Sequence, residues 1–228
     1  MICYLTPQQD MEFEEYLKPS FSEPPLYTPS VELTTAQQKL LDKLKLDNRD
    51  VMRVTLPMTM PPHRDGDGPI IETYPGTKPV KRPAFKVSPA QNAEIKRQIT
   101  EYLSKGHLRP TKSPWGAPVF LVKKAHSDKW RLVCDWRHLN SQTIKDRFEI
   151  PNPEQLFDKL GGSTWFTKLD LASGYHQIPL CESDRVKGAI FTRYGSYEWT
   201  VAPFGLTNVP SGFQRVLGMC YSSTRIHL

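Results

Sequence analysis

The feature that most constrains this chain is the spacing of its prolines, of which there are 21 among 228 residues. Seven of them lie between Pro57 and Pro83, together with three glycines. Because proline lacks a backbone N–H and breaks helices, this stretch predicts an extended connector. We therefore divide the chain into an N-terminal extension (1–50), a Pro-rich connector (51–87) and an ordered body (88–228).

The N-terminal extension is acidic. Residues 1–36 carry six acidic side chains and one lysine, a formal charge of −5 in a chain whose net charge is +6. This composition, without sustained periodicity, predicts that residues 1–33 are mostly disordered. Thr35 and Gln38 have the spacing of a capping box, and three leucines at helical spacing then predict a short helix near 36–46.

Outside residues 1–36, 29 basic and 18 acidic side chains give a charge of +11. A basic body fits a polyanionic partner such as nucleic acid, and it also fits an ordinary solvated surface. No run of 18 apolar residues predicts a membrane span, and the N-terminus lacks the pattern of a secretory signal. The cysteines suggest neither a zinc site nor disulfides; they are Cys3, Cys134, Cys181 and Cys220. We expect an intracellular protein that is not secreted.

The ordered body begins with a predicted helix over 89–105. Ser88 can cap it, Pro89 suits its first position, Gln91 can reach back to the cap, and Gly106 can end it. An apolar run at 117–122 and an alternating stretch at 129–136, joined by a polar turn, predict a β-hairpin.

The rest of the body mixes helices and strands. The predicted elements are a helix opened by Asn152 with Leu156, Phe157 and Leu160 facing inward, a strand at 164–170, a hairpin of strands 189–193 and 197–201 around Gly195 and Ser196, and a helix from Pro210. This mixed order predicts an α+β fold rather than a doubly wound sheet.

Three places in this body could carry chemistry. Lys124 at the turn of the first hairpin and Arg131 on its return strand can converge on one patch, as a triphosphate requires, or can be two solvated cations. Asp170 can be a Mg²⁺ ligand or a helix cap, and Tyr175 a site residue or a core residue. Gly205 permits close backbone approach to a ligand, or marks an ordinary strand-to-helix connection.

The order of these segments is more informative than any one of them. The runs SPWGAPVFLVKK, DKWRLVCDWRHLNSQTIKDRFEIP, TWFTKLDLASGYHQIPL and YEWTVAPFGLTNVPSGFQRVL resemble, in order, the fingers and palm of retroelement reverse transcriptases. The resemblance covers roughly residues 85–217 and is strongest to gypsy-class long-terminal-repeat retrotransposons and their retroviral relatives. It implies right-hand polymerase fingers and an incomplete palm, in a cytoplasmic particle or the nucleus.

The resemblance also implies partners, cofactors and roles. The partners would be an RNA template, a DNA primer and dNTPs, and the cofactors two Mg²⁺ or Mn²⁺ ions. Asp170 would be the catalytic, metal-binding carboxylate. The nucleotide-binding residues would be Lys124, Arg131, Leu171, Tyr175, Phe204 and Gly205. The template and primer residues would be Asp135, Arg137, Asn140, Asn208, Pro210 and Gln214.

One part of the family pattern has no match in the sequence. In the family the partners of Asp170 come from a Tyr-x-Asp-Asp hairpin, whereas no aspartate follows Asp184 here and Glu198 is the only later acid. No thumb or RNase H segment is expected either. Because one carboxylate does not hold two Mg²⁺ ions, we expect a fragment that is inactive alone. The alternative is a non-catalytic nucleic-acid-binding module.

Overall fold

The computed structural model describes residues 33–50, 59–61, 68–123, 128–148, 152–163 and 170–223. The chain forms two units, one of residues 4–57 and one of residues 1–3 and 58–228. The first contains α2 (Thr35–Asp47), which begins at a capping box made by Thr34 and Gln37. The predicted box was one residue too far along the chain, because Thr34 is the residue with extended backbone angles.

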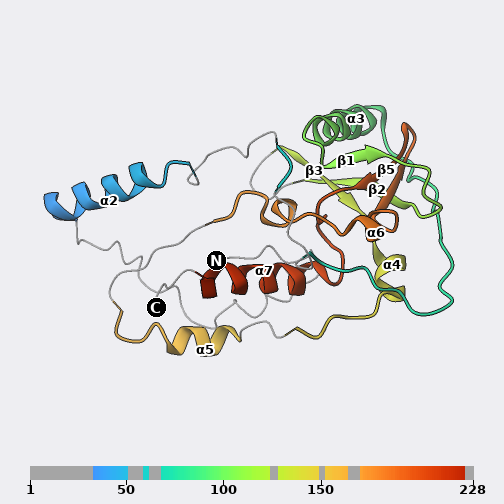
Figure 1. The fold of residues 1–228 in the computed structure, drawn as a ribbon. Helices are drawn as coiled ribbons and strands as arrows, with labels where there is room; N and C mark the ends of the chain where they lie inside the picture. Colours follow the sequence, from blue (N-terminus) through green and yellow to red (C-terminus); the bar gives the residue numbers. More distant parts are fainter. Residues whose placement is uncertain are drawn as a thin grey trace, which may run out of the picture. The chain divides into compact units, whose positions relative to one another are not determined.

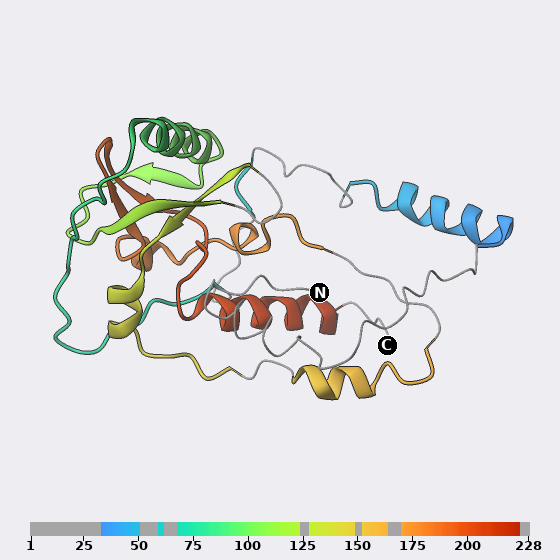
Figure 2. The ribbon, with the colours of Figure 1, turned by 180° about the vertical axis from the view of Figure 1, so that it is seen from behind.

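The larger unit is an α+β fold around one five-stranded sheet (Figures 1 and 2). Its elements are α3 (Pro89–Ser104), β1 (Leu108–Pro110), β2 (Ala117–Lys123), β3 (Trp130–Cys134), α4 (Arg137–Gln142), α5 (Pro153–Asp158), the 3₁₀ helix η1 (Gly174–Gln177), α6 (Glu182–Arg185), β4 (Ala189–Thr192), β5 (Gly195–Trp199) and α7 (Val209–Ser223). Among the residues described, no helix is long and apolar enough to cross a bilayer.

The sheet has the strand order β1-β5-β4-β2-β3. The hairpins β2–β3 and β4–β5 are antiparallel, as predicted, and the parallel pairing of β2 with β4 joins them. β1 adds to the outer edge of β5, and β3 forms the opposite edge. Both views in Figures 1 and 2 show α3 lying over the sheet, where it contacts β1, β2 and β3.

The helix α3 follows directly from its sequence. Ser88 and Gln91 form the predicted capping box, and Ile95 and Ile99 are buried against the sheet. Gly106, with φ of +70°, ends the helix in the left-handed conformation that favours glycine. The core beneath includes fully buried Leu, Ile and Val side chains, each worth about 1.5–3 kcal/mol of hydrophobic stabilisation; they are Leu180, Ile190, Val201 and Val209.

The described part of the Pro-rich connector has no helix, as predicted, but it packs into the larger unit. Ile71 is buried, its N–H donates to Asp184 at 2.9 Å, and its carbonyl accepts from Lys187 at 2.6 Å. Further on, Lys81 forms a bridge with Gly116 at the start of β2. The proline-rich sequence therefore excludes a helix without excluding tertiary contacts.

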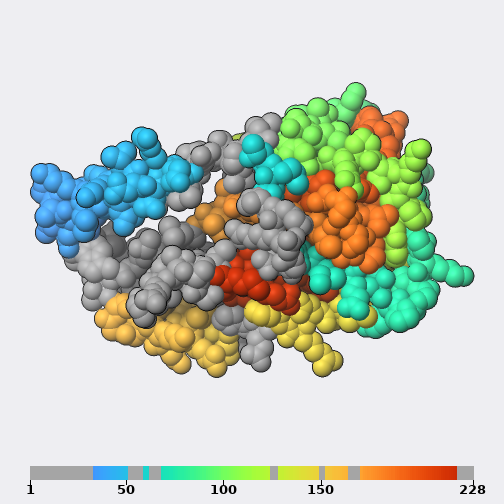
Figure 3. All heavy atoms as spheres, in the orientation of Figure 1, coloured from blue at the N-terminus to red at the C-terminus, as the bar shows by residue number. Residues whose placement is uncertain are grey.

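Three local predictions need correction or lie outside the description. The turn of the second hairpin is at residues 193–194, and Gly195, with φ of +137°, already begins β5. α5 begins after Asn152 as predicted, but the apolar side chains expected to face inward do not. Leu156 and Phe157 in the helix are 47% and 66% exposed, and Leu160 just after it is 45% exposed. Figure 3 shows α5, in gold, at the surface. The predicted strand at 164–170 falls almost entirely outside the described residues.

Candidate active site

The first hairpin presents the exposed Arg131 on β3, an edge strand of the sheet. Arg131 lies opposite Val122 in the antiparallel register, one pair away from Lys123 and Trp130 next to the turn. The ammonium group of Lys123 lies 5.7 Å from the centre of the Trp130 ring. Lys124, the other predicted phosphate ligand, lies outside the described residues. The described cation of the pair is therefore on a surface that a polyanion can reach.

Asp170 and Leu171 lie on an exposed segment that leads into η1. Between them and η1, Ser173 has φ of 48° and ψ of 47°, an uncommon backbone conformation for a residue other than glycine. Gly174 packs against Phe213 of α7 so closely that an added Cβ would lie 3.2 Å from its ring. The chain is thus held tightly immediately after the exposed carboxylate.

Tyr175 is buried in η1 and forms an aromatic cluster with two residues from further along the chain. Its ring centre lies 5.0 Å from that of Phe204 and 5.1 Å from that of Phe213. Phe204 is 37% exposed, so it carries the cluster to the surface. The buried ring of Tyr175 therefore supports the partly exposed ring of Phe204, which forms an aromatic wall at the surface.

The turn around Gly205 is held by residues at the start of α4. The indole Nε1 of Trp136 donates to the carbonyl of Phe204 at 3.0 Å, and Asn140 donates to the carbonyl of Gly205 at 2.8 Å. Asn140 also accepts from the N–H of Thr207 at 3.0 Å. Gly205 has φ of +91°, and an added Cβ would lie 3.2 Å from Trp136. The turn therefore requires glycine and fixes Phe204.

The buried carboxylate of Asp135 orients an exposed arginine. It accepts hydrogen bonds from Nε and Nη2 of Arg137, both at 2.8 Å, and Arg82 lies 3.8 Å away. These bonds from Arg137 are the main reason that the pKa of Asp135 lies below its usual range. The side chain of Arg137 is 82% exposed, so its guanidinium is held by Asp135 while the side chain stays open to solvent.

The other predicted template residues lie at and just before the start of α7. Asn208 is buried, accepts from the N–H of Asp146 at 3.0 Å, and donates to the carbonyls of Ile144 at 2.9 Å and Ile70 at 3.2 Å. Pro210 and Gln214 are half-buried in the first two turns of α7. Asn208 thus joins three segments of the chain through its amide.

The described residues fit one ligand of a divalent cation but not a two-metal site. Among them, no group of three or more His, Cys, Asp or Glu side chains could hold a metal ion. The later acid, Glu198, is buried and accepts from Arg109 and Thr111, both at 2.6 Å. A carboxylate so engaged is not available to complete a site with Asp170.

Sequence reasoning missed a buried pair of histidines next to this site. His176 stacks on Trp199 at 5.1 Å and lies 5.1 Å from Phe204 and 5.4 Å from His107, between ring centres. Burial, with smaller contributions from His107 and Lys105, lowers the pKa of His176 to about 3. His176 directly follows Tyr175, but an isolated histidine carries no sequence signal for burial.

Comparisons with known proteins agree on one group. Residues 122–226 match the family described as reverse transcriptase (RNA-dependent DNA polymerase). Two relatives from Drosophila melanogaster are the retrovirus-related Pol polyproteins from transposons 297 and gypsy, 38% and 39% identical over 143 and 145 residues. In each case the match covers 61% of this chain and 14% of the relative.

A viral relative and a solved structure extend this picture. The enzymatic polyprotein of cauliflower mosaic virus (strain CM-1841) is 37% identical over 142 residues, 61% of this chain and 21% of the relative. The structure of the foamy viral protease–reverse transcriptase in complex with RNA/DNA hybrid aligns with a TM-score of 0.65 at 20% identity. It covers 99% of this chain and 29% of that chain. The chain therefore spans only a minor part of these proteins.

Proposed function

We propose that this chain supplies the fingers and part of the palm of a retroelement RNA-directed DNA polymerase, because residues 122–226 match the reverse transcriptase family and the retrovirus-related relatives align over 61% of the chain. One structural observation supports the proposal independently of the family match. Three predicted nucleotide-pocket residues, Tyr175 and, about thirty positions later, the adjacent Phe204 and Gly205, form one cluster whose turn is fixed by Trp136 and Asn140. An aromatic wall of this kind can exclude water from one side of a bound nucleotide.

The proposed roles follow the exposure of each group. Arg131, always charged and planar, would bind phosphate oxygens of the incoming dNTP through its bidentate fork. The exposed Asp170 would provide one carboxylate ligand, and Phe204 would contact the base or sugar. The Mg²⁺ or Mn²⁺ ions of the family would neutralise the charge that develops on the transferring phosphoryl group.

We further propose that these 228 residues by themselves do not polymerise DNA. Mg²⁺ requires near-octahedral oxygen coordination and loses its waters reluctantly, so two ions need more than one carboxylate. What remains available is binding of an RNA template and DNA primer, to which the exposed Arg137 would contribute. This binding role is the second candidate function.

Primer extension tests the two roles. The chain is incubated with an RNA template, a labelled DNA primer, four dNTPs and Mg²⁺, beside a matched Asp170→Asn variant. We expect no extension by either protein, and retention of the RNA–DNA duplex that weakens steeply between two salt concentrations. Extension by the unaltered chain that Asp170→Asn abolishes would refute the claim of inactivity. Failure to retain the duplex at low salt would refute the binding role.

A further inference from the structure

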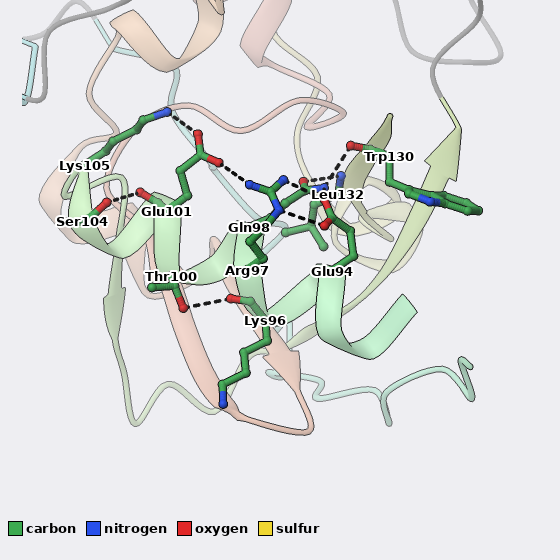
Figure 4. A network of polar contacts seen from close by, with 10 residues as sticks. All are labelled: Glu94, Lys96, Arg97, Gln98, Thr100, Glu101, Ser104, Lys105, Trp130 and Leu132. Carbon is green, nitrogen blue, oxygen red and sulfur yellow. Dashed lines mark hydrogen bonds and ion pairs between the residues drawn. The ribbon is translucent and has the colours of Figure 1, made fainter. Parts of the chain in front are cut away.

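The amide of Gln98 connects α3 to the edge of the sheet. Gln98 is buried, and its Nε2 donates to the carbonyl of Trp130 at 2.9 Å while its Oε1 accepts from the N–H of Leu132 at 3.0 Å. Figure 4 shows the side chain reaching from the helix to the strand between these two groups. One side chain therefore satisfies a backbone acceptor and a backbone donor two residues apart.

The residue between those two backbone groups is Arg131. β3 is the edge strand of the sheet, paired on its other side with β2 through a register that places Arg131 opposite Val122. In an antiparallel strand, alternate residues direct their backbone groups to the outer edge, so Trp130 and Leu132 would otherwise leave theirs without a strand partner. The side chain of Gln98 thus makes the two backbone hydrogen bonds that a further strand would make, on either side of Arg131.

Gln98 is itself held by a chain of charges along α3. Its second amide proton is donated to Glu94 at 2.7 Å, and Glu94 accepts from Nε and Nη2 of Arg97 at 2.8 and 2.7 Å. Arg97 also reaches Glu101, which pairs with Lys105 at 2.6 Å (Figure 4). Because the amide is fixed from the helix side, the strand cannot slide relative to α3 without breaking several bonds at once.

We propose that Gln98 is a positioning residue for Arg131, fixing the backbone on both sides of it and so the direction in which its guanidinium meets a nucleotide polyphosphate. This role rests on the proposed function, since it assigns Arg131 to the phosphates. A merely structural Gln98 would support the hairpin equally whatever side chain stood at position 131. A positioning role requires Arg131 to be present.

A double-mutant cycle separates these two roles. Affinity for dTTP with Mg²⁺ is measured by calorimetry for the unaltered chain, Gln98→Met, Arg131→Ala and the double variant. The exposed Lys96→Met on the same helix is the matched control. We expect Gln98→Met to weaken binding about tenfold when Arg131 is present, and less than about twofold in the Arg131→Ala background. Equal weakening in both backgrounds, or none in either, would overturn the proposal.

Two further measurements keep the result decisive. If Gln98→Met does not fold, Gln98→Glu, which keeps the acceptor for Leu132 but loses both donors, enters the same cycle with the same criterion. If the unaltered chain does not bind dTTP, the assignment of Arg131 to the phosphates fails. Amide hydrogen exchange then tests whether Gln98 anchors the backbone of β3. Exchange at Leu132 at least about tenfold faster in Gln98→Met than in Lys96→Met is expected. Unchanged exchange would overturn the anchoring itself.

Discussion

Replacing Asn140 by alanine should destabilise the larger unit and release the turn that carries Phe204. The amide makes two bonds to backbone groups of that turn, to the carbonyl of Gly205 at 2.8 Å and from the N–H of Thr207 at 3.0 Å. A net hydrogen bond contributes about 0.5–1.5 kcal/mol, and a partly buried partner left without its bond adds to the cost. We therefore expect Asn140→Ala to lower the free energy of unfolding by about 2–3 kcal/mol.

The assay is urea denaturation followed by tryptophan fluorescence, since Trp136 donates to the same turn. Asn140→Asp, which keeps the acceptor for Thr207 and loses the donor to Gly205, should cost about half as much. Ser141→Ala on the exposed face of α4 is the matched control and should change stability by less than about 0.5 kcal/mol. A value for Asn140→Ala within 0.5 kcal/mol of the control would refute the assignment of this amide as the anchor of the turn.

Three further predictions concern the same region. The pKa of His176 is lowered to about 3, so His176 stays neutral in the folded unit, whereas in the unfolded chain it binds a proton near its ordinary pKa of 6.5. The free energy of unfolding should therefore fall as pH drops from 6.5 towards 3. In acid titrations of the melting temperature, His176→Phe should flatten that dependence between pH 6.5 and 5. Glu94, whose pKa is lowered to about 2, mainly by Arg97, should lose its stabilising contribution only as pH falls from 4.5 towards 2, so Glu94→Gln should leave the slope above pH 5 unchanged. Gly205→Ala should cost at least about 1–2 kcal/mol in urea denaturation, since φ of +91° and a contact at 3.2 Å disfavour any Cβ, and a neutral result would show that the turn relaxes freely.

Local signals in the sequence predicted the parts of the fold that depend on neighbouring residues. The capping box at Ser88 and Gln91 begins α3, and the alternation before Trp136 forms β3. The turn of the second hairpin was misplaced by two residues because Gly195 has the positive φ expected of a turn while belonging to the strand. The apolar spacing of a helix also does not tell whether another element packs against it. Phe157, expected to face inward, is exposed.

The sequence proposed the candidate site as a set of residues, but it could not predict their surroundings. The resemblance singled out Asp170, Arg131 and Phe204, whereas the contacts found around Arg131 and Phe204 join residues far apart in the chain. Gln98 and the backbone around Arg131 are more than thirty residues apart, and His176 meets His107 across about seventy. No periodicity or spacing in the sequence predicts such pairs. Other pairings would have the same local energy, and only the packing of distant segments selects the pairs that form.

The contacts divide the residues of this region by chemistry into those that hold it and those that face outward. Gln98, Asn140 and Asn208 are amides whose donors and acceptors bind backbone groups of distant segments. An amide suits this task because it carries a donor and an acceptor side by side without a charge to desolvate. The exposed groups, by contrast, are ionised: Arg137 and Asp170. Replacing an amide should therefore alter stability first and binding second, whereas replacing the exposed Asp170 should alter the proposed metal and nucleotide binding with little change in stability.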